Sequence, residues 1–190
     1  GGALHTQKLL MGDRLYGVPV RYIFRPSGYR VKEEVWQQMG SLNMKTKTVL
    51  GGAYFIVHCE EIQKSIEEGR LPMFVCHELG SAYGAYLLGL PYVLIYHQQG
   101  SILNEIKAIN EEPCEEDIRV IHFIEAEVMK GADKVYFPSF GARKFFLDTC
   151  TLSEEEVGEV PFANDALYNT IPDYGLTEDK KTLFEKFGIE

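Results

Sequence analysis

The feature of this sequence that most limits its fold is an alternation of short apolar runs with longer amphipathic stretches. The apolar runs predict strands at residues 18–24, 71–76, 92–96, 134–138 and 158–162. The other stretches predict helices at residues 4–16, 31–40, 52–69, 81–89, 101–109, 116–133, 141–149 and 177–190. Strands that alternate with helices are typical of parallel sheets with helical crossovers. We therefore expect an α/β chain with a Rossmann-like, three-layer parallel sheet and helices on both of its faces.

The length and charge of the chain limit its range of partners. Its 190 residues suffice for one sizeable domain, which would bury roughly 70% of the surface of the unfolded chain. The net charge of -9 and the lack of a basic stripe argue against nucleic acid and against broad binding to anionic membranes. Acidic clusters at residues 110–117 and 153–156 are interpreted as solvated surface. No apolar run is long enough to span a membrane, and nothing supports peripheral attachment, which is left open.

The four cysteines, Cys59, Cys76, Cys114 and Cys150, contain no C-x-x-C pair and no spacing typical of metal ligands. Cys76 lies inside an apolar run, where a free thiol behaves as a small hydrophobic side chain. We interpret all four as reduced, which together with the lack of a signal peptide predicts a cytoplasmic protein.

Polar side chains follow the predicted strands at the points where the strands end. Ligands of open parallel sheets bind beyond the carboxyl ends of the strands. The candidates at these positions are His77 and Glu78 after 71–76, His97, Gln98 and Gln99 after 92–96, and Ser139 after 134–138. A single histidine is most often structural, and we interpret His58 and His122 in this way. His77 and His97 each end a buried strand, so a functional interpretation is as strong as a structural one for this pair.

The first residues of the chain also carry ligand-binding chemistry. Gly1 and Gly2 precede a predicted helix, where backbone N–H groups free of side chains can approach a phosphate, and His5 lies in the first turn. The G-x-G-x-x-G fingerprint and the Walker lysine motif are absent, which argues against the usual NAD and ATP sites. No G-x-S-x-G motif marks a hydrolase. A zinc site at His77 and His97 lacks further ligands at suitable spacing, so we expect no metal.

Taken in order, several runs resemble the N-terminal half of a GT-B glycosyltransferase. They are similar to the large retaining group (family 4) that includes glycogen synthase-like and lipopolysaccharide or capsule sugar transferases. The matching runs are "GGALHTQKLL", "MFVCHELGSAYGAYLLGLPYVLIYHQQG", "IEAEVMKGADKVYFPS", "VPFANDALYN" and "LFEKFGI". The resemblance covers nearly the whole chain, and it lies in the order and spacing of the runs more than in any single motif.

The resemblance implies a division of labour between two domains. The N-terminal domain binds a sugar, glycan or lipid-linked acceptor, and a C-terminal domain binds the nucleotide-diphosphate sugar, which is the co-substrate; no cofactor or catalytic metal is implied. His97 would be catalytic, near the transferred sugar, where a hydrogen bond can stabilise developing charge. Gly1 and Gly2 would face the donor diphosphate. The remaining cleft residues implied are His5, His77, Glu78, Gln98, Gln99, Ser139 and Asn164. Glu125 matches a position interpreted as structural.

The sequence also departs from the family pattern. Leu4 stands where the family often has an acidic residue, and Asp165 replaces the glycine that usually follows the asparagine at position 164. The E-x7-E element of the donor domain is absent. We therefore expect residues 1–172 to form the acceptor domain, with its first strand upstream of residue 1. Residues 173–190 would be a linker helix toward the donor domain, and the chain would be inactive alone.

Two other functions remain open at this stage. One is half of a sugar-nucleotide 2-epimerase, which would use the same double-Rossmann scaffold without the E-x7-E pattern. The other is a non-catalytic module, flavodoxin-like or regulatory, that binds a small ligand or a partner domain.

Overall fold

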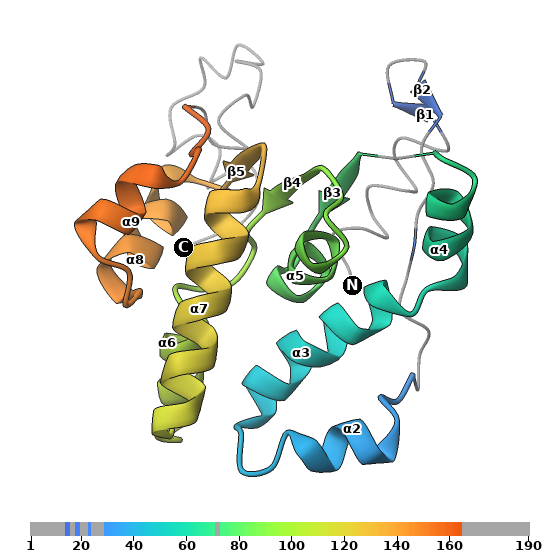
Figure 1. The fold of residues 1–190 in the computed structure, drawn as a ribbon. Helices are drawn as coiled ribbons and strands as arrows, with labels where there is room; N and C mark the ends of the chain where they lie inside the picture. Colours follow the sequence, from blue (N-terminus) through green and yellow to red (C-terminus); the bar gives the residue numbers. More distant parts are fainter. Residues whose placement is uncertain (1–13, 16–17, 20–22, 24–28, 71–72, 165–190) are drawn as a thin grey trace, which may run out of the picture.

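The computed structural model describes residues 14–15, 18–19, 23, 29–70 and 73–164 of the chain (Figure 1). Its strands are β1 (Arg14–Leu15), β2 (Val18–Pro19), β3 (Phe74–Cys76), β4 (Tyr92–Ile95) and β5 (Lys134–Tyr136). Its helices are α2 (Glu33–Gln38), α3 (Met44–Val57), α4 (Glu60–Glu67), α5 (Leu79–Leu87), α6 (Ile102–Ala108), α7 (Glu115–Gly131), α8 (Phe140–Thr149) and α9 (Glu154–Glu159). The predicted helix 177–190 and linker 173–190 lie outside the described residues.

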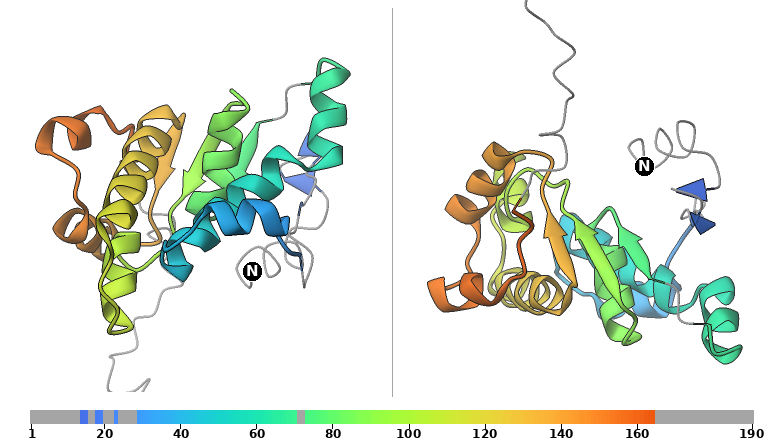
Figure 2. Two further views of the ribbon diagram at one scale, coloured as in Figure 1. Left: turned by 60° about the horizontal axis from the view of Figure 1, so that its bottom comes forward. Right: turned by 90° about the horizontal axis from the view of Figure 1, so that it is seen from above.

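Three strands form a small, open, parallel sheet in the order β3-β4-β5 (Figure 2). Phe74 pairs with Tyr92 on one side of β4, and Ile95 pairs with Tyr136 on the other. Helices separate the strands along the chain, as the alternating pattern predicts. The α/β class and the parallel pairing are thus confirmed.

The two faces of this sheet are covered unequally. Tyr92, Leu94 and Tyr96 point to one face and are all buried, and α5 and α7 lie side by side over that face (Figure 2). On the opposite face Val75 is 50% exposed, and Lys134 is exposed as well. The expected three-layer sheet, with helices on both faces, is therefore seen only in part in the described residues.

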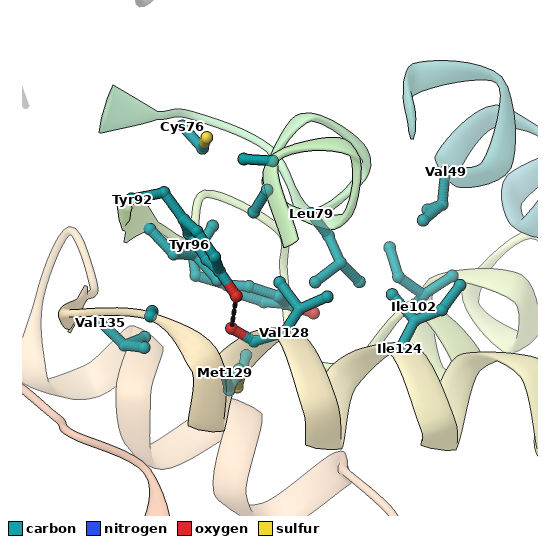
Figure 3. Packing of buried hydrophobic residues seen from close by; sticks show 14 of the residues in the cluster. Val49, Cys76, Leu79, Tyr92, Tyr96, Ile102, Ile124, Val128, Met129 and Val135 are labelled. Atoms are coloured by element: carbon teal, nitrogen blue, oxygen red, sulfur yellow. Dashed lines mark hydrogen bonds between the residues drawn. The ribbon is translucent and has the colours of Figure 1, made fainter. Parts of the chain in front are cut away.

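The core lies between the sheet and α7. Side chains of β4 meet Val128 and Met129 of α7, both with no exposed surface (Figure 3). The hydroxyl of Tyr92 donates a hydrogen bond of 2.7 Å to the carbonyl oxygen of Val128, which joins the start of β4 to the end of α7 (Figure 3). A buried phenol that finds a partner in this way adds apolar contact area without leaving a polar group unpaired.

Glycines allow α3 and α5 to pack at very short range. A Cβ atom added to Gly80 would lie 2.5 Å from the carbonyl oxygen of Val49, and one added to Gly52 would lie 3.2 Å from the Cα atom of Gly80. A Cβ atom at Gly84 would lie 2.5 Å from the Cβ atom of Ile56. At Gly80 the facing atom belongs to the backbone and leaves no room for a side chain, whereas Gly52 and Gly84 make tight contacts with α5 and with the Ile56 side chain. This contact anchors α3 to the helix that follows β3.

The helix predicted at 52–69 is wrong in its bounds. α3 begins at Met44, where the side chain of Asn43 accepts a hydrogen bond of 2.9 Å from the backbone N–H of Lys45. It ends at Val57, and α4 follows from Glu60 after a short break. The expected bounds rest on apolar positions between Phe55 and Ile66, so they miss the start of α3 and the break before α4.

Two predicted strands are shorter than expected. Of the strand predicted at 18–24, β2 contains Val18–Pro19, and it pairs antiparallel with β1 rather than within the parallel sheet. β1 occupies Arg14–Leu15, where the sequence predicts the end of the helix 4–16; the rest of that helix lies outside the described residues. The strand predicted at 158–162 is reduced to one parallel bridge between Phe162 and Val135.

Residues 158 and 159 belong instead to α9, whose start is fixed by a capping box. The hydroxyl of Ser153 accepts a hydrogen bond from the backbone N–H of Glu156, and the carboxylate of Glu156 accepts one from the backbone N–H of Ser153. This local signal outweighs the apolar residues that follow.

The acidic cluster at 110–117 is not entirely solvated, contrary to the sequence interpretation. Asp117 is only 1% exposed. Its carboxylate accepts hydrogen bonds from the backbone N–H groups of Asn43 and Cys114 and from the hydroxyl of Thr46, at 2.9, 3.0 and 2.7 Å. Asp117 thus joins the N-terminal ends of α3 and α7.

All four cysteines are free, and Cys76 is buried in β3 as predicted. None of the helices built from the described residues combines the length and the apolar character needed to cross a membrane.

Candidate functional site

The carboxyl ends of β3 and β4 bring His77 and His97 together. Cys76 pairs with Leu94 in the sheet, so the residues that follow the two strands leave it at the same edge. The Nδ1 atom of His77 lies 3.2 Å from the Nε2 atom of His97, at hydrogen-bonding distance. The two rings are nearly parallel, with an interplanar angle of 9° and centroids 5.4 Å apart. Their positions after adjacent strands left a functional and a structural interpretation equally strong, and the structure shows that the two rings are in contact.

Both imidazoles are uncharged at neutral pH. Partial burial, followed by the charge of His97, lowers the pKa of His77 from 6.5 to about 4. Partial burial also lowers the pKa of His97. A neutral imidazole has one N–H donor and one acceptor nitrogen. Because one ring donates to the other, the two outer nitrogens, Nε2 of His77 and Nδ1 of His97, together present one donor and one acceptor, whichever ring donates.

Gln98 carries a polar atom without a partner. Its Oε1 atom is buried and accepts no hydrogen bond from the part of the chain that the structure describes. Buried carbonyl oxygens in proteins are usually satisfied, so an unpaired one next to His97 needs a physical reason. A hydroxyl group of a bound molecule could donate the missing hydrogen bond to this oxygen.

The tip loop, residues 97–100, is held firmly between α6 and the end of α8. The backbone N–H of Gln99 donates to the carboxylate of Glu105 at 3.1 Å, and the amide of Asn104 donates to the carbonyl oxygen of Gln99 at 3.3 Å. Gly100 has a φ of +80°, and a Cβ atom there would lie 2.6 Å from the hydroxyl of Thr149. Nothing in the local sequence signals this crowding, because Thr149 lies far from Gly100 in the chain.

Glu125 of α7 forms a buried network behind the tip loop. Its carboxyl group accepts hydrogen bonds from the hydroxyls of Tyr96 and Ser101 and from the backbone N–H of Ile102, each at 3.0 Å. All three donors flank the tip loop. The sequence assigned Glu125 a structural role by resemblance, but the partners of its carboxyl group could not be read from spacing.

Three other predicted cleft residues, Glu78, Ser139 and Asn164, follow β3, β5 and the bridge at Phe162 without joining the histidine pair. Glu78 is exposed at the N-cap position of α5, and the hydroxyl of Ser139 caps α8 by accepting from the backbone N–H of Ala142 at 3.0 Å. Asn164 is exposed, just past the bridge between Phe162 and Val135. In the described part of the chain, none of the three hydrogen-bonds to His77 or His97. Gly1, Gly2 and His5 lie outside the described residues.

The described residues contain no group of three or more histidine, cysteine, aspartate or glutamate side chains placed to hold a metal ion. The site offers a pair of neutral imidazoles and a buried amide oxygen beside a loop that is hydrogen-bonded to α6.

Comparison with known proteins gave no match. No family model, no curated protein and no solved structure is significantly similar to the chain.

Proposed function

We propose that the chain is the acceptor-binding half of a retaining glycosyltransferase, with the finer architecture of one half of a GT-B fold. In this proposal the pair His77–His97 binds a hydroxyl group of a neutral, hydroxyl-rich acceptor. The observation that carries it is the hydrogen-bonded, uncharged imidazole pair at the carboxyl edge of the parallel sheet. Ligands of such sheets bind at this edge.

The hydrogen-bonding pattern of the pair supports a hydroxylated ligand. A sugar hydroxyl both donates and accepts a hydrogen bond, and the two outer nitrogens of the pair offer one acceptor and one donor. The unpaired Oε1 atom of Gln98 adds an acceptor for a second hydroxyl. Because both imidazoles are neutral, the pair lacks the positive charge that an anionic acceptor would favour.

In the proposed reaction the acceptor oxygen forms a bond to the anomeric carbon of the donor sugar. The bond from that carbon to the diphosphate breaks, and its electron pair leaves with the diphosphate. The acceptor proton passes to the leaving diphosphate oxygen, and the new bond lies on the face that the diphosphate occupied. His97 would donate a hydrogen bond as charge develops in the transition state. The diphosphate would be bound by a donor domain, which the resemblance to GT-B glycosyltransferases implies.

The test uses the full-length product of the gene that encodes these residues. Nucleotide-diphosphate sugars of glucose, galactose, mannose and N-acetylglucosamine are each incubated with a set of neutral methyl glycosides, and products are detected by mass spectrometry. NMR then gives the anomeric configuration of the product. We expect transfer with retention, and His97→Ala should lower kcat by about a hundredfold or more.

The matched control is His122→Ala. His122 lies on α7, where its ring contacts the hydroxyl of Thr151 at 3.0 Å and the carboxylate of Glu156 at 3.3 Å, so it belongs to the packing of α9. We expect this variant to keep kcat within about twofold. Absence of transfer with every donor, transfer that His97→Ala leaves intact, or epimerisation of the donor sugar without an acceptor would overturn the proposal.

A further inference from the structure

The carboxyl group of Glu125, on α7, forms hydrogen bonds with residues on both sides of the tip loop. Glu125 has no exposed surface. Its Oε1 atom accepts from the hydroxyl of Tyr96, the residue before the loop, and from the backbone N–H of Ile102. Its Oε2 atom accepts from the hydroxyl of Ser101, the residue after the loop.

We propose that Glu125 is a positioning residue that sets the place of His97 by tying the two ends of the tip loop together. Among the described residues, Glu125 is the one whose side chain forms hydrogen bonds both with the residue before the tip loop, Tyr96, and with the residues after it, Ser101 and Ile102. Tyr96 and His97 are neighbours in the chain, so the hydrogen bond that holds the phenol of Tyr96 also holds the backbone from which the imidazole of His97 projects. The consequence for sugar transfer rests on the proposed function, whereas the structural part does not.

The protons in this network can be counted. The hydroxyl of Tyr96 has one proton but lies 3.0 Å from two acceptors, the carbonyl oxygen of Gly100 and the Oε1 atom of Glu125. When Glu125 carries a proton on Oε1, it donates to the Tyr96 oxygen, and Tyr96 donates to Gly100, so every group is paired. When Glu125 is ionised, the Tyr96 proton turns to the carboxylate, and the Gly100 carbonyl loses this donor.

The balance between these two states falls near neutral pH. Burial raises the pKa of Glu125 to about 7, although hydrogen bonds from Ile102, Ser101 and Tyr96 act in the opposite direction. Burial also raises the pKa values of the Tyr96 phenol and the Cys150 thiol, which face Glu125, so both stay protonated.

One more charged group faces the network. The carboxylate of Glu105 raises the pKa of Glu125, and it forms an ion pair of 3.0 Å with Lys45. When Glu125 is protonated, the Tyr96 hydroxyl is thus free to donate to the carbonyl oxygen of Gly100 at the end of the tip loop. When Glu125 ionises, that carbonyl loses its donor.

The test compares three variants of the full-length protein by NMR. Glu125→Gln keeps the size of the side chain and, like the protonated acid, both accepts and donates hydrogen bonds, but it cannot ionise. Glu125→Leu removes all three hydrogen bonds. The matched control, Tyr92→Phe, deletes a buried hydrogen bond of 2.7 Å between the same strand and helix, away from the loop. Backbone amide shifts are followed from about pH 5.5 to about pH 8.5, a window that brackets the raised pKa of Glu125 and lies above the ordinary pKa of a glutamate carboxyl.

In the unaltered protein we expect the amide shifts of Ser101 and Ile102 to change with a midpoint near pH 7, and this change should vanish in Glu125→Gln. In Glu125→Leu, amide exchange at residues 97–102 should rise by about tenfold or more relative to β5. In Tyr92→Phe the tip loop should keep its exchange rates relative to β5. A midpoint that is absent, or that persists in Glu125→Gln, would overturn the proposal, as would equal loosening of the loop in the Tyr92→Phe control.

Transfer is assayed in parallel with these variants. We expect Glu125→Leu to lower kcat by about tenfold or more with little change in KM, and Glu125→Gln to retain most of it at about pH 6.5. The NMR readouts do not depend on transfer. Loop changes without any transfer by the unaltered protein would therefore refute the proposed function alone, and transfer without the loop changes would refute the positioning role alone.

Discussion

The Nδ1 atom of His77 and the Nε2 atom of His97 are 3.2 Å apart, although twenty residues separate them in the chain. Parallel pairing of β3 with β4 produces this contact. Because Cys76 pairs with Leu94, the residues that follow the two strands leave the sheet at the same edge. His97 is the first residue of the tip loop, and hydrogen bonds to α6, α7 and α8 hold the loop and the two residues that follow it.

Stability should fall in mild acid because of the histidine pair. The pKa of His77 falls on folding from 6.5 to about 4, so the neutral form is favoured in the folded state. The stabilisation is present above pH 6.5 and is lost as the pH falls toward 4. We expect a loss of about 1–2 kcal/mol, allowing for the partial exposure of His77. Urea unfolding of the protein and of His77→Asn at several pH values measures it, and parallel curves for the two proteins would contradict the interpretation.

Gly80→Ala should destabilise the contact between α3 and α5. The new Cβ atom would lie 2.5 Å from the carbonyl oxygen of Val49, a backbone atom that cannot rotate away. We expect a loss of about 2–3 kcal/mol in the free energy of unfolding, measured by urea titration. The control is Gly158→Ala in α9, where nothing lies within 4 Å of the added Cβ atom. It should be neutral or stabilising by up to about 1 kcal/mol, and equal losses in the two variants would rule out the close contact.

Gly100→Ala should disturb the tip loop for two reasons. The residue has a φ of +80°, and its Cβ atom would meet the Thr149 hydroxyl at 2.6 Å. The control Gly69→Ala has a φ of +70° with nothing within 4 Å, so it isolates the backbone cost. We expect Gly69→Ala to cost about 1 kcal/mol and Gly100→Ala about 2–3 kcal/mol in thermal unfolding. Similar losses would show that the space around Gly100 is not limiting.

Asp117→Ala should separate the N-terminal ends of α3 and α7. Burial alone would raise the pKa of Asp117, but hydrogen bonds from Thr46, Cys114 and Asn43 outweigh it and lower the pKa. We expect the variant to lose about 2–3 kcal/mol of unfolding free energy at neutral pH. In the unaltered protein this contribution is present above pH 3.8 and is lost as the pH falls below it, through the lowered pKa.

The control for Asp117→Ala is Glu116→Ala, the exposed neighbour, which should change stability by less than about half a kcal/mol. Equal losses in the two variants at neutral pH would contradict the buried role of Asp117.

The sequence was a good guide to the strands that carry the histidine pair. The apolar runs that end at Cys76 and Tyr96 are buried and bounded by polar residues, so their positions and their parallel pairing could be predicted. The helix 116–133 was equally clear, because its apolar positions recur at helical spacing and α7 spans Glu115–Gly131. Local patterns suffice where burial and periodicity agree.

Other features depend on contacts between distant residues, which periodicity does not encode. The break between α3 and α4 and the glycine contact of Gly80 with α3 arise from tertiary packing. The burial of Asp117 within an acidic run reflects its reach to Asn43 and Thr46, seventy or more residues earlier. The Glu125 network and the unpaired oxygen of Gln98 were likewise visible only once α7 and the tip loop lay together.

The most direct test of the account is the protonation of the histidine pair, measured by the nitrogen-15 shifts of the two imidazole rings as a function of pH. We expect both rings to be neutral at pH 7, His77 to titrate near pH 4 and His97 below 6.5, with one ring N–H held in the hydrogen bond between them. Addition of a neutral acceptor sugar should shift the outer nitrogens, Nε2 of His77 and Nδ1 of His97. Titration of both rings at or above pH 6.5, independently of each other and unaffected by sugar, would contradict the account.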